Sequence, residues 1–187
     1  MTTLAAIQGE GWCAIAADSQ VSDETGFTME IVTGKVFSSG PALIAAAGSV
    51  RGINILQFAW TAPACTTKST DVYMTKTFIP AMRRAFIENG YDMKSDGDVA
   101  SNENEFLIAV KGVLYSVDDD YSWERCSRHL YAGGSGANYA LGALSVLGAE
   151  KSKSIEDASR FLRKAVATSI KYDAYSGGDI TVFSQEA

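Results

Sequence analysis

Thr2, which follows the initiator methionine, is the residue of this chain best placed to act as a nucleophile. Its side chain is small, so we expect methionine aminopeptidase to remove Met1 and to leave a threonine that carries both a hydroxyl and a free α-amine. An α-amine titrates near pH ~8, so at neutral pH it can act as a base for the hydroxyl of its own residue. This arrangement is the Thr/N-terminal-amine form of an activated nucleophile. Because Met-Thr openings are common, the alternative is an ordinary strand start.

Four further places put polar residues at strand ends or glycine turns. Asp18 closes an apolar stretch, and Lys35 stands between a glycine turn and an apolar pair; a turn residue and a surface lysine are the alternatives. Ser135 lies in Gly-Gly-Ser-Gly-Ala, which resembles a nucleophile elbow except that Ala137 stands where the motif requires glycine. The alternative for this segment is a glycine-rich helix start that packs closely. The segment could also bind a phosphate at the helix N-terminus, but the sequence lacks the known phosphate-loop spacings. The segment 173–178, Asp-Ala-Tyr-Ser-Gly-Gly, is by itself a good turn.

The histidine and cysteine content excludes several kinds of chemistry. The chain has one histidine, His129, so any Ser-His-Asp or Cys-His mechanism would have to use it. A zinc site with two or three histidines or with a Cys-x-x-Cys pair is excluded, and we expect no cofactor. Cys13, Cys65 and Cys126 are odd in number and widely separated, which suits a reducing compartment better than a disulfide framework.

The bulk composition is that of a globular protein. Its 187 residues fit one domain, 1–187, and 47% of them are apolar while 20% are charged. A net charge of −6 without a basic stripe argues against a nucleic-acid-binding protein. No apolar run reaches the ~18 residues of a membrane span, and the start of the chain lacks the pattern of a signal peptide. We therefore expect a cytoplasmic protein that binds neither nucleic acid nor membrane.

Apolar patterning predicts that groups of strands alternate with pairs of helices. Apolar runs between glycine turns predict strands, apolar residues at helical spacing predict helices, and Pro80 should kink its helix or mark its true start. The predicted strands are 2–9, 11–18, 27–32, 35–37, 42–47, 106–110, 113–117, 121–125, 130–132 and 179–183. The predicted helices are 50–62, 71–89, 137–147 and 154–171, and 91–104 is predicted to be a surface loop. This order predicts an α+β protein, a four-layer αββα sandwich of two antiparallel sheets each covered by a helix pair.

Taken together, these places resemble the proteasome β-subunit family, which includes the HslV-type bacterial peptidases. The segments that carry the resemblance follow the order of the family from Thr2 to about Val182: Thr2-Thr3, Asp18, Lys35, the Ala-Ala-Gly turn 46–48, Gly134-Ser135-Gly136 and the Asp-x-x-Ser-Gly-Gly turn 173–178. No single segment is specific to the family. The resemblance rests on the six segments occurring together, in the order and near the spacing of the family. The resemblance implies the N-terminal-nucleophile (Ntn) hydrolase fold, which is an αββα sandwich.

The resemblance also implies a catalytic group of seven residues: Thr2, Asp18, Lys35, Gly48, Ser135, Asp173 and Ser176. Thr2 would be the nucleophile through its hydroxyl and the base through its freed amine. Lys35, held charged by Asp18, would lower the pKa of that hydroxyl. The backbone N–H of Gly48 would be the oxyanion donor, and the two serines and Asp173 would hydrogen-bond around the amine and relay its proton.

For the substrate, the resemblance implies an unfolded polypeptide. Ser22 and Gly48 would bind its backbone as an added strand, and Val21, Ala46 and Val50 would line the pocket for the side chain before the cut. The activity implied is that of a threonine endopeptidase enclosed in stacked six- or sevenfold homo-oligomeric rings, with an ATPase unfoldase ring as partner.

One departure and three alternatives stand beside this interpretation. The segment 33–35 contains one residue more than the Asp-to-Lys spacing of the family, and an inserted strand residue reverses side-chain direction unless a bulge absorbs it. The alternatives are an Ntn amidase acting on a small amide, a non-catalytic structural relative that retains Met1, and a histidine-dependent hydrolase that uses His129. Ring assembly counts against the first, a mature N-terminus at Thr2 against the second, and activity without His129 against the third.

Overall fold

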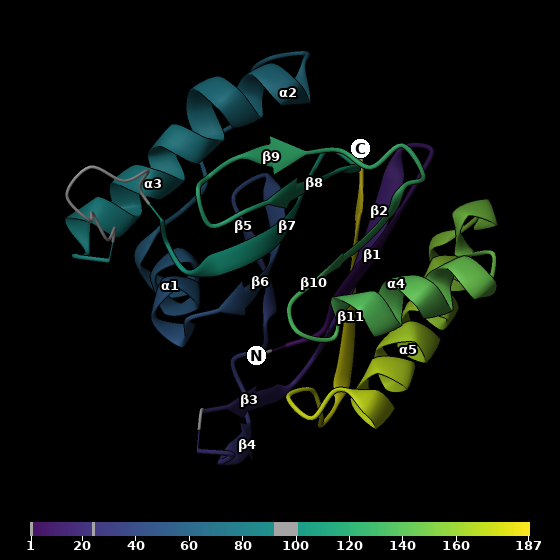
Figure 1. Ribbon diagram of the computed structural model, residues 1–187. Coiled ribbons are helices and arrows are strands. Elements are labelled where there is room, and N and C mark those ends of the chain that lie inside the picture. The colour runs from purple at the N-terminus through teal and green to yellow at the C-terminus, as the bar shows by residue number, and fades with distance from the viewer. Residues whose placement is uncertain (1, 24, 92–100) are drawn as a thin grey trace.

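Two antiparallel sheets lie face to face at the centre of the computed structural model, which describes residues 2–23, 25–91 and 101–187 (Figure 1). The first sheet has the order β10–β1–β2–β11. Its strands are β1 (Leu4–Gly9), β2 (Trp12–Asp18), β10 (Leu130–Gly133) and β11 (Ile180–Glu186). The β1–β2 hairpin turns at Gly11, whose φ of 74° lies in the region that glycine adopts most readily. The first and last strands of the chain therefore flank one central strand.

The second sheet has the order β5–β6–β7–β8–β9. Its strands are β5 (Val36–Ser39), β6 (Ala42–Gly48), β7 (Asn104–Val110), β8 (Val113–Val117) and β9 (Trp123–Glu124). A separate two-stranded ribbon, β3 (Gln20–Ser22) with β4 (Thr28–Glu30), follows β2 directly and lies beside the start of the chain (Figure 1). The ribbon thus carries residues that come straight after Asp18.

Alanines and larger apolar side chains together fill the space between the two sheets. Ala6 and Ala17 of the first sheet share one buried cluster with Ala45 and Ala47 of the second, and Leu107 of β7 adds a larger side chain. Because alternate residues of a strand point to opposite faces, the other face of each sheet is also apolar and needs a cover.

Helices cover the outer face of both sheets (Figure 1). The second sheet is covered by α1 (Val50–Asn54), α2 (Thr70–Tyr73) and α3 (Ile79–Glu88), which share a buried cluster with its apolar residues. The first sheet is covered by α4 (Ala137–Val146) and α5 (Ile155–Tyr172), whose apolar faces meet its small residues. The predicted αββα sandwich is therefore confirmed.

Two helices differ from the prediction in detail. The predicted helix 71–89 begins as α2, passes through a π-helical stretch, Met74–Phe78, and continues as α3. The N–H of Ile79 donates to the carbonyl of Met74, one residue further back than in an α-helix, directly before Pro80, which has no N–H to donate. Pro80 therefore marks the start of α3, as one of the two predicted alternatives requires.

The predicted helix 50–62 is shorter in the structure. It passes from α1 into a π-helical stretch, Ile55–Ala59, and ends there. The strand predicted at 27–32 is β4, with only three residues, and the strand predicted at 121–125 is β9, with two. Most of the loop predicted at 91–104 lies outside the described residues.

A short polar cap explains where the last helix begins. Ser154 is extended, and its hydroxyl accepts a hydrogen bond from the backbone N–H of Asp157, while Glu156 and Asp157 put negative charge in the first turn. The helix runs for 18 residues and ends next to Asp173. This register brings the turn 173–178 to the start of the chain, where the candidate site lies.

Candidate active site

Thr2 lies just before β1, where the chain enters the space between the sheets. Only 3% of the residue is exposed. Its backbone carbonyl accepts a hydrogen bond from the N–H of Gly136 at 3.3 Å, and its backbone nitrogen donates to Ser135 Oγ at 3.3 Å. Residues 133 to 136 therefore hold the start of the chain in place. Met1, whose removal the sequence predicts, lies outside the described residues.

Ser135 connects the backbone nitrogen of Thr2 to a buried carboxylate. The Ser135 hydroxyl donates to Asp173 Oδ2 at 2.8 Å, and the Ser176 hydroxyl donates to the same oxygen at 2.6 Å. Asp173 follows the end of α5, and 7% of it is exposed. The structure thus brings together four of the residues predicted for the site, from the two ends of the chain and from the start of α4.

Thr3 and Ser169 extend this network, and the sequence analysis missed both. Thr3 Oγ1 lies 2.6 Å from Ser176 Oγ and 2.6 Å from Ser169 Oγ, and the Ser169 hydroxyl donates to the carbonyl of Gly136 at 3.0 Å. Ser169 is fully buried on α5, one helical turn before Asp173. A serine at an apolar helical position four residues before the acidic residue was the signal available in the sequence.

Asp18 and Lys35 form a second buried group on the other side of Thr3. Lys35 Nζ donates to Asp18 Oδ1 at 2.8 Å and to the carbonyl of Gln20 at 2.5 Å. Asp18 Oδ1 also accepts from the N–H of Thr3 at 2.9 Å, and Oδ2 accepts from the N–H of Gly177 and of Gln20. The side chains of Lys35 and Asp18 are 1% and 0% exposed. This carboxylate is therefore surrounded by donors.

The electrostatics of Lys35 follow from this burial. Removal from water lowers the pKa of the Lys35 ammonium, while the negative charge of Asp18 opposes that change. Among the hydrogen bonds of the described residues, Lys35 Nζ makes none to the hydroxyl of Thr2. Asp18 Oδ1 connects Lys35 to the start of the chain, because it accepts hydrogen bonds from both Lys35 Nζ and the N–H of Thr3.

The extra residue between Asp18 and Lys35 lies in a turn. Gly34 has a φ of 71°, and β5 begins only after Lys35, at Val36, which pairs with Ala45. The additional residue precedes the regular pairing, so it does not alter the register of β5 and β6. The extra residue therefore does not turn the Lys35 side chain away from the site, and Lys35 points toward Asp18.

Gly48 ends β6 at the mouth of a cavity. Its φ of 116° favours glycine, and a Cβ at this position would lie 2.2 Å from the carbonyl oxygen of Glu103. The cavity has a volume of about 530 Å³ and is lined by two groups of residues. The first group is Thr2, Ala47, Gly48, Gly134 and Ser135, and the second is Glu103, Asn104, Glu105, Asp118 and Asp119.

Of the residues predicted to bind substrate, Gly48 lines this cavity, whereas Val21, Ser22, Ala46 and Val50 do not. Val21 and Ser22 are half-buried on β3, and Val50, the first residue of α1, is 39% exposed. Ala46 is fully buried in the cluster beneath α1 to α3. Of the residues predicted for the site, only Thr2, Gly48 and Ser135 line the cavity.

Comparison with solved structures identifies similar chains. The Thiobacillus denitrificans protein named BPH is 26% identical, with a TM-score of 0.78 over 99% of this chain and 98% of that chain. Its complex with epoxomicin is 25% identical with the same TM-score and coverage. HslV from Trypanosoma brucei is 17% identical, with a TM-score of 0.68 over the whole of both chains. The chain has the Ntn-hydrolase fold.

Comparisons by sequence give no family: neither a protein-family model nor a curated protein matches this chain. With identities of 17% to 26% to the structures above, most residues of this chain differ from theirs. The relation is carried by the arrangement of the backbone.

The described residues include no metal-binding cluster and one deeply buried thiol, Cys13. Within residues 2–23, 25–91 and 101–187, no three His, Cys, Asp or Glu side chains are grouped so that they could hold a metal ion. Burial raises the pKa of the Cys13 thiol to about 12, so this thiol is a poor nucleophile. Of the helices in the described part of the chain, none combines the length and apolar character needed to cross a bilayer.

Proposed function

We propose that the chain is a threonine endopeptidase of the proteasome and HslV kind, with Thr2 as nucleophile after removal of Met1. One observation carries the proposal. The backbone nitrogen of Thr2 is linked through Ser135 to Asp173, while the buried pair of Asp18 and Lys35 lies on the other side of Thr3. An amine that acts as base and a cation that stabilises the deprotonated oxygen are the two groups proposed to activate the N-terminal threonine.

The first half of the reaction forms an ester on Thr2. The free α-amine of Thr2, directly or through a water, takes the proton of its own hydroxyl, and the oxygen attacks the carbonyl carbon of the peptide bond. When the C–N bond breaks, the leaving nitrogen takes the proton from the α-ammonium. Ser135 and Asp173 orient the amine and accept its hydrogen bonds, which favours the charged intermediate form.

Water completes the reaction. The amine takes a proton from a water molecule, the resulting hydroxide attacks the ester, and the Thr2 oxygen leaves and is protonated again. The N–H of Gly48 is proposed to donate to the negative oxygen that forms in both halves, and loss of one such donor lowers rates by about 10²–10³-fold. Lys35 stabilises the deprotonated Thr2 oxygen by its positive charge, which Asp18 maintains against burial.

Substrate binding is proposed on the β3 side of Thr2. A polypeptide would add as a strand between Ser22 and Gly48, and Val21, Ala46 and Val50 would shape the pocket for the side chain before the cut. Ala46 is buried in the present state, so its contribution would be to limit the depth of that pocket. The substrate residues after the cut would bind on the side of Thr2 that faces away from β3.

The comparisons support an assembled peptidase. One similar structure is HslV and another holds epoxomicin, so we propose membership of the proteasome and HslV family and binding of the same compound here. We further propose a single domain, stacked six- or sevenfold homo-oligomeric rings, an ATPase unfoldase ring as partner and a cytoplasmic location. Enclosure in a ring would restrict cleavage to unfolded polypeptides.

The proposal is tested by the intact mass of the purified protein before and after treatment with epoxomicin or another N-terminal-threonine-directed covalent inhibitor. We expect loss of the Met1 mass and one adduct per chain, and no adduct on the Thr2→Ala variant. A ring that retains Met1 and takes no adduct would be a structural relative without activity. An adduct on a monomer that cleaves only small amides would favour the amidase.

A further inference from the structure

Glu105 lies where the two sheets meet beside the candidate site. It is the second residue of β7, two positions before Leu107, whose side chain is buried between the sheets. Because alternate residues of a strand share a face, the Glu105 side chain points to the same side, at the edge of that space. Its backbone pairs with Ala47, the residue before Gly48. Glu105 is exposed and lines the cavity that contains Thr2.

The side chain of Glu105 reaches across to the segment that follows β10 of the first sheet. Its Oε2 accepts a hydrogen bond from the backbone N–H of Gly134 at 2.8 Å. An ionised acceptor makes this bond stronger than one between neutral groups. A Cβ on Gly134 would lie 3.2 Å from that of Ala47 and 2.2 Å from the carbonyl oxygen of Thr2. Gly134 is therefore held in close contact with both β6 and the start of the chain.

The segment 133–136, Gly-Gly-Ser-Gly, has little rigidity of its own, because three of its four residues are glycines. It carries Ser135, whose Oγ accepts from the Thr2 nitrogen at 3.3 Å and donates to Asp173 at 2.8 Å. A distance of 3.3 Å is long for a bond of this type, so a small shift of Ser135 would break it. An anchor on Gly134, the residue before Ser135, limits such a shift.

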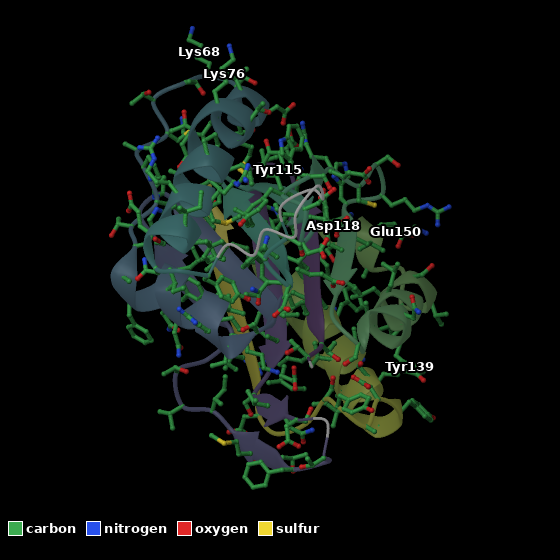
Figure 2. All side chains as sticks on the ribbon, turned by 60° about the vertical axis from the view of Figure 1, so that its left-hand side comes forward. Lys68, Lys76, Tyr115, Asp118, Tyr139 and Glu150 are labelled. Carbon is green, nitrogen blue, oxygen red and sulfur yellow. The ribbon has the colours of Figure 1, made fainter. Side chains whose placement is uncertain are left out.

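The Glu105 carboxylate is not shared with a lysine or arginine of the described residues, where it takes part in no ion pair. In Figure 2, Lys68 and Lys76 project from the far end of the α2 layer, well away from Asp118. Asp118 lines the same cavity as Glu105. Removal of the Glu105 carboxylate therefore leaves no cation of the described chain unpaired, and substitutions at this position report on the bond to Gly134.

We propose that Glu105 is a positioning residue of the peptidase reaction, which keeps Ser135 within reach of the Thr2 amine. It does so by holding the N–H of Gly134 against β6, the strand that ends at the proposed oxyanion donor, Gly48. The proposal rests on the function proposed above and adds a residue that acts through Ser135 rather than on the substrate. A misplacement of about 1 Å in such a site lowers rates by up to about 10²-fold.

Three substitutions at Glu105 separate the hydrogen bond from the charge. Glutamine keeps an acceptor oxygen at the same reach, aspartate keeps the charge but is a methylene shorter, and alanine removes both. We expect Glu105→Ala and Glu105→Asp to lower kcat by about tenfold with little change in KM, and Glu105→Gln to retain most of the native kcat. Active sites are counted from the adduct with the N-terminal-threonine-directed inhibitor, so that unfolded protein does not enter kcat.

Asp118→Ala is the matched control, because Asp118 is an exposed acid of the same cavity whose carboxylate accepts no hydrogen bond within the described residues. Partial loss of solvent, and after it the negative charge of Glu105, raises the pKa of Asp118, so the two carboxylates are close enough to interact. The control should leave kcat close to native. Native kcat in Glu105→Ala, a rise in KM alone, or a loss in Glu105→Gln that Glu105→Asp avoids would each overturn the inference, while adduct formation by the same proteins would leave the peptidase proposal intact.

Hydrogen exchange of two backbone N–H groups, measured by NMR, tests the anchor without any turnover. In the Thr2→Ala protein, adding Glu105→Ala should speed exchange at Gly134, which loses its acceptor, and at Gly136, which donates to the carbonyl of residue 2, by about tenfold. Glu105→Gln should protect both groups, and exchange within β10 should stay native. If no protein forms an adduct, the function proposed above fails, and faster exchange would still support the anchor. Unchanged exchange at Gly134 and Gly136 would refute it in either case.

Discussion

Lys35 Nζ lies 2.8 Å from Asp18 Oδ1, and both side chains are almost completely removed from solvent. Such a pair contributes little net stability by itself, because the cost of desolvating two charges offsets their attraction. The position of the pair explains why it is there better than its stability does. The Asp18 carboxylate accepts hydrogen bonds from the N–H of Thr3 and of Gly177, and so joins the start of the chain to the turn after α5.

Asp18→Asn should destabilise the protein more than Lys35→Met. The asparagine would face the donors of Lys35, Gln20 and Gly177 with an amide nitrogen in place of one oxygen, and the lysine would be left without its counter-charge. Removing one partner of a buried pair costs about 3–5 kcal/mol. Lys35→Met leaves a carboxylate that still accepts three backbone N–H bonds, so its cost should be about 1–3 kcal/mol. Urea unfolding measures both, and the reverse order would contradict this account.

Activity should fall on the alkaline side at a pH below 10.5, the ordinary lysine value, because burial lowers the pKa of Lys35. Above its folded pKa the group is neutral and no longer stabilises the Thr2 oxygen. Asp18 opposes the lowering, so Asp18→Asn should move the alkaline limb to still lower pH. The measurement is kcat/KM against pH for the two proteins. An alkaline limb that Asp18→Asn leaves in place would assign the limb to another group.

The lowered pKa of Lys35 also makes stability depend on pH, but in the opposite direction to activity. A lysine whose pKa is lower in the folded state binds fewer protons when folded, between that lowered value and 10.5, so the free energy of unfolding should rise with pH in that window. Lys35→Met should remove this rise. Unfolding curves across the alkaline range check the sign, and a fall with pH in the native protein that Lys35→Met abolishes would contradict it.

Ser135→Ala should lower kcat far more than it lowers stability. The substitution removes the only side-chain link in the described residues between the Thr2 nitrogen and Asp173. Loss of a positioned acid–base partner lowers the rate by about 10²-fold or more, and steady-state kinetics together with urea unfolding measure both effects.

Thr3→Val and Thr3→Ser form a matched pair of variants next to Thr2, because serine keeps the hydroxyl that contacts Ser169 and Ser176 and valine does not. We expect Thr3→Ser to retain most of the activity and Thr3→Val to lose about tenfold.

The layers of the fold could be predicted from the sequence because its periodic segments are strong and are bounded by glycine turns. The strands 106–110 and 113–117 around Lys111-Gly112 and the capped helix after Ser154 are examples, and both are present with bounds close to those predicted. The π-helical stretch before Pro80 could not be predicted, since it depends on how the helix packs and on which carbonyl the N–H of Ile79 reaches.

The contacts of the candidate site could not be predicted from local pattern. Thr3 and Ser169 are 166 positions apart, and the one local signal, a serine at an apolar helical position four residues before Asp173, does not indicate which residue Ser169 contacts. The same holds for Lys35, which by its sequence neighbours is an ordinary surface lysine and which only the folded chain buries. The lining of the cavity also combines two separate segments, 103–105 and 118–119, which belong to or follow neighbouring strands of one sheet.

Gly48→Ala and Gly142→Ala should have opposite effects on stability. At Gly48 a methyl group would lie 2.2 Å from the carbonyl oxygen of Glu103 and would impose a φ of 116° on alanine, which costs about 1–3 kcal/mol before any displacement. Gly142 lies inside α4 with no heavy atom within 4 Å of the added Cβ, so alanine should stabilise the helix by about 0.5–1 kcal/mol. Alanine keeps the backbone N–H of the proposed oxyanion donor, but the clash with Glu103 should displace that N–H and lower kcat by up to about 10²-fold, whereas Gly142→Ala should leave kcat unchanged. A Gly48→Ala protein that is destabilised as expected and yet has native kcat would contradict the link between the position of this N–H and the rate.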